Sequence, residues 1–398
     1  MTLKEELEIL RGEPIKVFDG DPMNIPCIET SDPEKLCKNP VVSVLMITYN
    51  HEPYIRQAIE GVVMQKTDFE FELIIGEDCS QDKTREICFE YQKKFPDKIR
   101  VLWANVNVAK LGGNSRRIRA YSRGEFIALC EGDDYWVDPL KLKKQVDIMR
   151  KFPNVGFCFC GAKRYYQNNG TYDNWNDGHI SYKPGIQAKA AFFASFMFGF
   201  SPGHPGNKYA GFIMTATTMV RRSVYIKISD AFDIFKWQLR VGDATIWLAA
   251  STMSDGYYLE DQVAVYRIAD TGVFQNPKSK MSILVDGMLI RLYFLKKVWG
   301  LCYTDCPPNY IFHINTFVAT ILSSHLKIKQ YARAQRMLPK DARLAQWRWY
   351  TIPFWLLALS GFLVGPFWSM AGFLAKCGQH ITKKWPDRLL TKYRASGL

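Results

Sequence analysis

The 398-residue chain lacks the features that mark secreted and zinc-stabilised proteins. Its first residues, MTLKEELEIL, contain no basic stretch followed by an apolar one, so we expect no secretory signal peptide. The ten cysteines are scattered and show no paired Cys or His spacing of a zinc site, which favours reduced cytosolic thiols. Acidic residues are fewer than basic ones, 39 against 52, and the net charge of +13 favours a polyanionic partner such as an acidic membrane surface or nucleic acid.

Apolar residues, by contrast, are plentiful, at 47% hydrophobic and 14% aromatic, enough for a large core. The length suits one large domain with appendages or two domains. Residues 1–40 are polar and rich in proline, which indicates a short helix followed by an irregular arm. Residues 41–275 alternate apolar runs with helical patterns, which is typical of an α/β domain with a mostly parallel sheet. The expected strands are 41–47, 71–75, 99–103, 126–129, 155–166, 210–221 and 257–267. The expected helices are about 53–65, 82–94, 141–152, one opening at 242 and one entered through a basic, Gly-containing turn at 111–119.

Two later stretches of the chain have less regular patterns. Residues 167–209 are rich in Asn, Gly, Pro and Tyr, and they form either a substrate loop or a disordered surface insertion. Residues 277–344 have a helical pattern. We therefore divide the chain into an arm (1–40), an α/β domain with a nucleotide-binding half and an acceptor half, a helical region and a tail, at 41–138, 139–275, 276–348 and 349–398.

A cluster of carboxylates ends the fourth expected strand. Glu131, Asp133 and Asp134 follow the apolar run 126–129 directly. Three carboxylates within four residues repel one another, so they either surround a cation or remain in water. Hard oxygen ligands of this kind suit Mg²⁺ or Mn²⁺, which in turn suit a diphosphate.

Three polar segments, each at the end of an expected strand, carry a family resemblance. They are Thr48-Tyr49-Asn50, Glu77-Asp78-Cys79-Ser80-Gln81-Asp82-Lys83-Thr84 and Glu131-Gly132-Asp133-Asp134-Tyr135-Trp136. In this order they resemble the inverting family-2 glycosyltransferases of the GT-A fold, over roughly residues 40–275. Glu77 stands where the family has Asp, and Cys79 where it has Gly. The resemblance implies a Rossmann-like, mostly parallel sheet with helices on both faces.

The resemblance also implies roles for the donor side of the site. Asp78 would accept the N3–H of uracil from a UDP-sugar, and Tyr49 would pack beside the base. Asp134 would coordinate Mn²⁺ or Mg²⁺, with Asp133 nearer the ribose or sugar. Arg117 would either contact phosphate or lie on a solvated helix face. The donor-binding set is then Thr48, Tyr49, Asn50, Glu77, Asp78, Arg117 and Asp133.

The acceptor side rests on weaker matches. Gly242-Asp243 resembles the family's Gly-Asp-Trp pattern, with Ala244 in place of Trp, so Asp243 would be either the catalytic base or a helix cap. Trp247 would stack on an acceptor sugar or lie in the core. Arg267 belongs to a Tyr-Arg-Ile segment that is similar to a late family element, although Ala269 replaces a frequent His. We expect Trp136, Trp247 and Arg267 to contact acceptor or phosphate.

Residues 349–375 carry no charged side chain and are flanked by basic residues on both sides. As one helix they would be ~40 Å long, above the ~30 Å hydrocarbon core of a bilayer, but Pro and Gly interrupt them. We expect attachment to the cytoplasmic membrane face, with a single span or a buried helical hairpin as alternatives. The acceptor would then be a polyprenyl-linked or surface glycan. A soluble transferase acting on protein or free oligosaccharide, a homo-oligomer and a non-catalytic sugar-nucleotide-binding scaffold remain alternatives, whereas nucleic-acid binding is disfavoured because the positive charge surrounds an apolar segment.

Overall fold

The computed structural model describes residues 2–11, 14–18, 20–111, 113–174, 182–189, 192–193, 213–239, 242–269 and parts of 286–298. The chain forms two compact units, one of Lys16–Asn276 and one of Met1–Ile15 with Pro277–Leu398. The described part of the second unit contains α1 (Leu3–Arg11) and helical residues within 286–298. The site predicted from the sequence lies in the first unit.

The described residues of Lys16–Asn276 build one eleven-stranded sheet with the order β1-β4-β3-β2-β5-β10-β7-β11-β6, with β8 on β7 and β9 on β11. The strands are β1 (Ile28–Thr30), β2 (Val42–Thr48), β3 (Phe71–Glu77), β4 (Ile99–Trp103), β5 (Phe126–Leu129), β6 (Tyr135–Trp136), β7 (Val155–Tyr166), β8 (Thr171–Asn174), β9 (Gly185–Gln187), β10 (Met219–Arg221) and β11 (Asp255–Ile268). The helices are α2 (Ile55–Val63), α3 (Thr84–Lys94), α4 (Asn114–Ala120), α5 (Lys141–Lys151), α7 (Arg222–Ala231) and α8 (Gly242–Met253). Short 3₁₀ turns are η1 (Pro22–Asn24), η2 (Val108–Leu111), η3 (Thr215–Thr217) and η4 (Asp233–Lys236).

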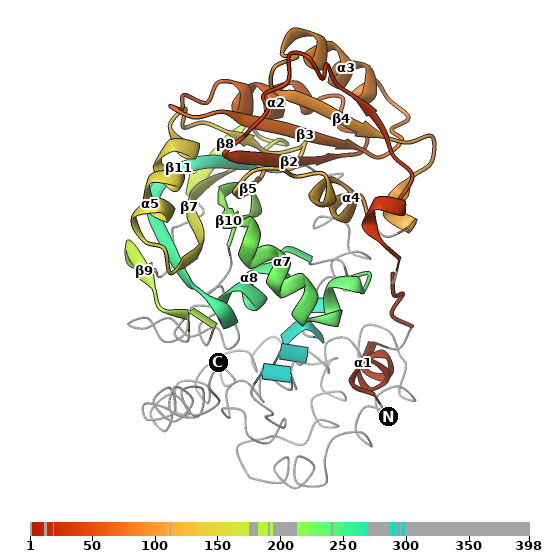
Figure 1. The fold of residues 1–398 in the computed structure, drawn as a ribbon, viewed down its shortest axis with the longest axis vertical. Helices are drawn as coiled ribbons and strands as arrows, with labels where there is room; N and C mark the ends of the chain where they lie inside the picture. The colour runs from red at the N-terminus through yellow and green to blue at the C-terminus, as the bar shows by residue number, and fades with distance from the viewer. Residues whose placement is uncertain are drawn as a thin grey trace, which may run out of the picture. The chain divides into compact units, whose positions relative to one another are not determined.

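The first half of the sheet is parallel, as the alternating pattern predicts. β2 pairs in parallel with both β3 and β5, and β3 pairs in parallel with β4. The residues of β3 are all buried, which explains its continuous apolar run. Figure 1 shows α2 and α3 on one side of these strands and α4 on the other. Parallel pairing brings the carboxyl ends of β2, β3 and β5 to one edge, which is where open α/β sheets bind ligands.

The second half makes the sheet mixed. β10 runs antiparallel between β5 and β7, and β7 is parallel to β11. The two-residue strand β6 pairs antiparallel with β11 through Tyr135 opposite Val265. We refer to residues 131–134, which carry Glu131, Asp133 and Asp134, as the acidic turn. The β6–β11 pairing brings the residues that follow this turn against the end of β11, which carries Arg267.

The prediction of a strand over 210–221 is wrong for most of its described part. Residues 215–217 form the η3 turn, and only 219–221 form a strand. Thr217 Oγ1 donates to the carbonyl of Met214, and Thr218 Oγ1 donates to that of Thr215. Threonine hydroxyls that bond to nearby carbonyls offer the backbone an alternative to a sheet ladder. The strands β1, β6, β8 and β9 and the helix α7 were not predicted.

The tail and much of the expected loop lie outside the described residues. This applies to residues 349–375 and to most of 175–212. Among the described residues, no helix is both long enough and apolar enough to cross a membrane.

Candidate active site

The acidic turn follows β5 directly and is held against β2. The amide of Cys130 donates to the carbonyl of Leu45, and that of Gly132 donates to Ile47. A Cβ on Gly132 would lie 2.8 Å from Thr48 Oγ1 and 2.9 Å from His51 Nδ1, so this position requires glycine. The turn is thus packed closely against the end of β2.

Burial and mutual repulsion raise the pKa values of the acidic-turn carboxyls. Burial raises the pKa of Glu131 to about 8, with further contributions from the charges of Asp133 and Asp243. The pKa of Asp134 is raised by burial and then by Asp133 and Glu131. Carboxylates in this state are stabilised as anions by a cation placed beside them.

Asp243 lies close enough to the acidic turn to interact with it electrostatically. Burial raises the pKa of the Tyr266 phenol, and the charges of Asp134, Asp133, Glu131 and Asp243 raise it further. All four carboxylates therefore lie near enough to this phenol to raise its pKa. The structure brings the expected base and the expected metal motif to one place.

Asp243 lies in the first turn of α8, as predicted. Its Oδ1 accepts a hydrogen bond of 2.8 Å from the amide of Ala244, and its Oδ2 accepts one of 2.9 Å from Thr215 Oγ1. Burial raises the pKa of this carboxyl, and both hydrogen bonds lower it. Carboxylate oxygens accept more than one hydrogen bond each, so this group retains capacity for an acceptor hydroxyl.

Arg267, at the end of β11, is hydrogen-bonded to the acidic turn. Its amide donates to Asp134 Oδ1 at 2.9 Å, and its Nε donates to the carbonyl of Asp133 at 3.0 Å. Its Nη2 donates to Gln57 Oε1, and its guanidinium lies over the rings of Tyr54, Tyr135 and Tyr165. Arg267, which was predicted to contact acceptor or phosphate, therefore lies against the acidic turn and is hydrogen-bonded to two of its residues.

The turns after β2 and β3 are bonded to each other. Asn50 and Cys79 have positive φ values of 54° and 62°, which non-glycine residues seldom adopt. The amide of Asn50 donates to Ser80 Oγ, and Asn50 Oδ1 accepts from the amide of Gln81. Such strained conformations persist where surrounding contacts impose them, and they cluster at ligand-binding sites. Tyr49 projects from this paired turn and is 44% exposed, which leaves its ring available to a ligand.

The two acidic residues that end β3 have different environments. Both are buried. Asp78 accepts hydrogen bonds from the amides of Val108 and Ala109 in η2, and burial raises its pKa. Glu77 accepts from the amide of Ser80 and forms an ion pair with Arg85 at 2.6 Å. Glu77 therefore shapes the turn, while Asp78 connects it to the η2 segment.

Three further residues of the predicted site are buried in structural positions. Arg117 is fully buried and donates to the carbonyls of Pro26, Glu77 and Leu102, so it does not lie on a solvated helix face. Trp136 is buried and donates from Nε1 to the carbonyl of Ala216 at 2.7 Å. Trp247 is also buried, near Phe157. The core alternative that the sequence left open for Trp247 matches its position.

The residues of the acidic turn fit a divalent cation by chemical type. Within the described ranges, no three His, Cys, Asp or Glu side chains converge as a ready-made metal cage. Mg²⁺ commonly uses only one or two carboxylates together with substrate phosphates, so a full protein cage is not required. The buried atoms Thr48 Oγ1 and His51 Nδ1 have no hydrogen-bond partner and lie against Gly132 in the turn. Such polar atoms beside a carboxylate cluster are consistent with a site completed by water or substrate.

Two residues of the site were not predicted. Thr215, which bonds to Asp243, lies in the segment that was predicted as a strand. Tyr266 precedes Arg267, so alternation along a strand would have placed its side chain on the opposite face. That alternation argues against a place for Tyr266 beside Arg267, which is why the sequence pattern did not identify it.

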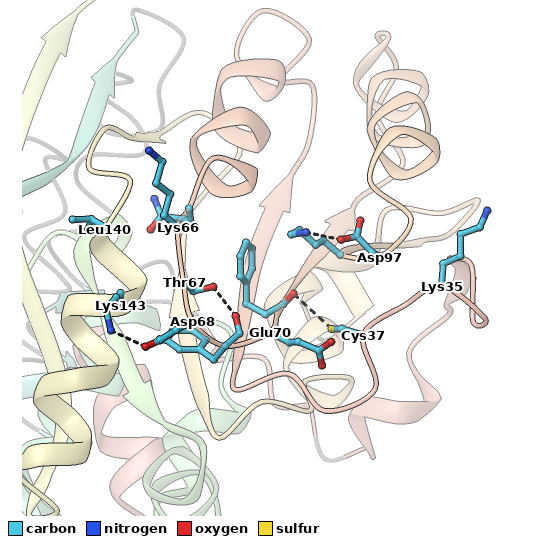
Figure 2. A pocket seen from close by; sticks show the side chains of 13 residues that line it. Lys35, Cys37, Lys66, Thr67, Asp68, Glu70, Asp97, Leu140 and Lys143 are labelled. Carbon is cyan, nitrogen blue, oxygen red and sulfur yellow. Dashed lines mark hydrogen bonds and ion pairs between the residues drawn. The ribbon is translucent and has the colours of Figure 1, made fainter.

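A cavity of about 750 Å³ lies at the amino ends of the parallel strands, away from the acidic turn. Figure 2 shows lysine and acidic side chains around it, including the pair Lys143–Asp68. Asp97, also labelled there, is paired with Lys98. Because the ligand edge of such a sheet is the carboxyl one, we place the candidate site at the acidic turn.

Comparison with known proteins agrees with this geometry. Residues 43–229 match the family described as Glycosyl transferase family 2. An uncharacterized protein of Mycobacterium tuberculosis is 40% identical over 127 residues, which are 32% of this chain and 36% of that protein. The Bacillus subtilis protein TuaG, named for teichuronic acid biosynthesis as a glycosyltransferase, is 29% identical over 136 residues, 34% of this chain and 52% of TuaG. Human dolichyl-phosphate beta-glucosyltransferase is 30% identical over 136 residues, 32% of this chain and 42% of that enzyme.

The matched stretch thus spans about a third to a half of the length of these curated relatives. Among solved structures, residues 1–349 of S. aureus TarS in complex with UDP-GlcNAc give a TM-score of 0.49 at 17% identity, covering 76% of this chain and 83% of that one. Residues 43–229 therefore belong to glycosyl transferase family 2, and the chain carries a glycosyltransferase domain with a GT-A-like α/β fold.

Proposed function

We propose that the protein is a metal-dependent, inverting glycosyltransferase that moves a sugar from a nucleotide sugar, UDP-linked, to a glycan acceptor. The observation that carries this proposal is the electrostatic coupling of Asp243 to Glu131 in the acidic turn. An inverting transfer needs a base on the side of the sugar opposite the leaving group. The proximity of Asp243 to the acidic turn supports it as that base, with the sugar lying between Asp243 and the leaving diphosphate.

In the proposed reaction, an acceptor hydroxyl oxygen attacks the anomeric carbon and forms the new glycosidic bond. The bond from that carbon to the diphosphate oxygen breaks, and the nucleoside diphosphate leaves. Asp243 takes the hydroxyl proton. Its hydrogen bonds from Ala244 and Thr215 orient the carboxylate for this task.

The acidic turn would hold the donor diphosphate. Asp134 would coordinate Mn²⁺ or Mg²⁺, and Asp133 would lie beside the ribose or sugar. A bound divalent cation supplies neutralisation of the charge that develops on the leaving diphosphate. Arg267 keeps both residues in place through its contacts with their carboxylate and backbone oxygens.

The donor base would bind at the paired turns after β2 and β3. Tyr49 offers an exposed ring for stacking, and Asp78 offers a carboxylate at the end of β3. The uracil specificity rests on the position of Asp78 in the resembled motif. Thr48 and Asn50 would support this turn, and Asn50 does so through its bond to Gln81.

The acceptor would be a lipid-linked or surface-glycan precursor at the cytoplasmic membrane face. Support comes from the uncharged residues 349–375 and their basic flanks. It also comes from the names of two relatives, one assigned to teichuronic acid biosynthesis and one to dolichyl phosphate. A soluble acceptor, either protein or free oligosaccharide, is the alternative outcome of the experiment below.

The test is a panel of UDP- and GDP-sugars with the full chain and Mn²⁺, read out as released nucleoside diphosphate. Membrane lipid extract, peptides and free oligosaccharides are supplied in separate reactions. We expect release with one UDP-sugar, stimulated by lipid extract and abolished by EDTA. No release from any donor, together with no binding of UDP by calorimetry, would contradict the proposal.

A further inference from the structure

The η3 turn (Thr215–Thr217) connects the acidic turn to the proposed base. We infer that Thr215 is a positioning residue for Asp243 and that the η3 turn fixes the base relative to the donor-binding turn. This inference rests on the proposed function of Asp243. It assigns a role to a residue that neither the sequence motifs nor the family resemblance identified.

The first link is the hydrogen bond from Thr215 Oγ1 to Asp243 Oδ2, at 2.9 Å. The other carboxylate oxygen is held by the amide of Ala244 at 2.8 Å. One donor on each oxygen determines the rotation of the carboxylate about its χ2 bond. Without Thr215, only backbone amide donors, those of Ala244 and of Asp243 itself, would remain in the described contacts of this group, and the carboxylate would rotate more freely.

The second link joins the η3 turn to the acidic turn. Trp136 stands two residues after Asp134, and its Nε1 donates to the carbonyl of Ala216 at 2.7 Å. The indole is buried, so this bond is shielded from water. The residue next to Thr215 is therefore tied to the strand that follows the acidic turn.

The third link comes from α5. Gln145 Nε2 donates to the carbonyl of Thr217 at 2.8 Å, and its Oε1 accepts from Lys141 Nζ at 2.8 Å. Both side chains are fully buried. Burying a lysine costs free energy unless its amino group is hydrogen-bonded. Here that group donates to Gln145 Oε1, and this bond fixes the orientation of the amide that holds the η3 turn. The same ammonium lies 4.0 Å from the ring centroid of Trp136.

The backbone of the turn has little freedom to move. The carbonyls of Met214, Thr215, Ala216, Thr217 and Thr218 accept hydrogen bonds from Thr217, Thr218, Trp136, Gln145 and Leu129, respectively. Five successive carbonyls are thus satisfied, and three of the donor residues, Trp136, Gln145 and Leu129, belong to other elements. Because the segment is bound in this way, the positions of β5 and β6 determine the position of Thr215. Thr215 in turn determines the orientation of the Asp243 carboxylate.

The Thr215 hydroxyl also affects the charge state of the base. Burial disfavours the anion of Asp243, whereas a hydrogen bond donated to the carboxylate favours it. The hydroxyl therefore opposes the rise in the pKa of Asp243 that burial causes. Loss of this bond should raise the pKa of Asp243.

The test compares Thr215→Val, which removes the hydroxyl at similar volume, with Thr215→Ser, which retains it. The matched control is Thr252→Val in the same helix as Asp243, because Thr252 is also buried and its hydroxyl bonds to the carbonyl of Ala249. For Thr215→Val we expect kcat for transfer to fall about 10- to 100-fold, the scale of a hydrogen bond to a charged group. We also expect the acidic limb of the kcat profile to move to higher pH, while the Kd for UDP is unchanged.

Thr215→Ser should restore both the rate and the pH profile, and Thr252→Val should leave both near wild type. Wild-type rate and pH profile in Thr215→Val would overturn the inference. So would an equal loss in Thr252→Val, which would indicate general damage to α8. A fully active Asp243→Asn variant would contradict the proposed role of Asp243 as the base. This outcome differs from a failure of the Thr215 inference, in which Asp243→Asn is inactive and Thr215→Val behaves as wild type.

A second measurement does not depend on turnover. Carboxyl ¹³C NMR of labelled aspartate, assigned with Asp243→Asn, follows the titration of Asp243 in the full-length protein. We expect its pKa to be higher in Thr215→Val than in wild type and to return with Thr215→Ser. An unchanged titration would contradict the hydrogen bond as a determinant of the base.

Discussion

Asp243, at the start of α8, lies close enough to Glu131, after β5, for its charge to raise the pKa of the Glu131 carboxyl. The two residues are distant in sequence, since Glu131 follows β5 and Asp243 opens the helix that precedes β11. Their proximity brings the expected base beside the expected metal motif. The mechanism proposed for this domain depends on that relationship.

Substitution of the base should separate chemistry from binding. We expect Asp243→Asn to lower kcat for transfer by about 10²- to 10⁴-fold, because the amide cannot take the acceptor proton. The Kd for UDP, measured by calorimetry, should remain within about twofold of wild type. The control is Asp147→Asn, an exposed residue on α5. A variant with full activity would exclude Asp243 as the base.

Substitution in the acidic turn should change the metal requirement. We expect Asp134→Asn to raise the Mn²⁺ concentration needed for half-maximal activity and to lower activity at least about 100-fold, because it removes the anionic ligand. The change is measured by titrating Mn²⁺ at saturating donor. Asp138→Asn in the following loop is the control. An unaltered Mn²⁺ dependence in Asp134→Asn would place the cation elsewhere.

Arg117 should be a determinant of stability. Its guanidinium is fully buried and donates to several carbonyls, so Arg117→Met removes one donor from each of those oxygens. We expect a loss of about 2–5 kcal/mol in the free energy of unfolding, measured in urea. Arg116→Met, its less buried neighbour, should cost much less. Unchanged stability with weaker donor binding would instead support the phosphate contact that the sequence suggested.

Lys141 should make stability depend on pH in alkaline solution. Burial lowers its pKa to about 8 from the ordinary value of 10.5. Between these pH values the unfolded chain binds a proton that the native protein does not. The free energy of unfolding therefore rises with pH, because the cost of burying a charged Lys141 is progressively removed. Relative to Lys141→Met, the wild-type free energy of unfolding should increase between pH 8 and pH 10, by about 3 kcal/mol at most.

The measurement for Lys141 is urea unfolding of both proteins at each pH, so that titrations common to both cancel. Lys143→Met replaces a lysine of the same helix that is paired with Asp68 at the surface. It should show no such increase. A constant difference between wild type and Lys141→Met would contradict the lowered pKa.

Apolar runs bounded by polar residues determined the first half of the fold. The runs 41–47, 71–75 and 126–129 became β2, β3 and β5, because burial on both faces requires a continuous apolar segment. Their parallel pairing then placed the three polar segments at one edge. The order of the three polar segments along the chain was therefore enough to predict that they meet at one edge of the sheet.

Helix phase and packing decided what the sequence left open. Arg116 and Arg117 are adjacent and chemically equal in sequence, but only Arg117 points into the buried contact between α4 and the ends of the strands. Trp136 and Trp247 are buried for the same kind of reason. Local composition gives no information on which side chain meets an interior carbonyl.

The sequence by itself determined the parallel strands, the acidic turn after β5 and the presence of Asp243 at a helix start, because these depend on local patterns. Only the tertiary structure decided that Asp243 lies beside Glu131 and that Thr215 holds it. The hydroxyl bonds of Thr217 and Thr218 replace part of an expected strand with a turn. That turn is positioned by Trp136 and Gln145 from elements far away in the chain, and a contact of this kind exists only after the sheet has formed.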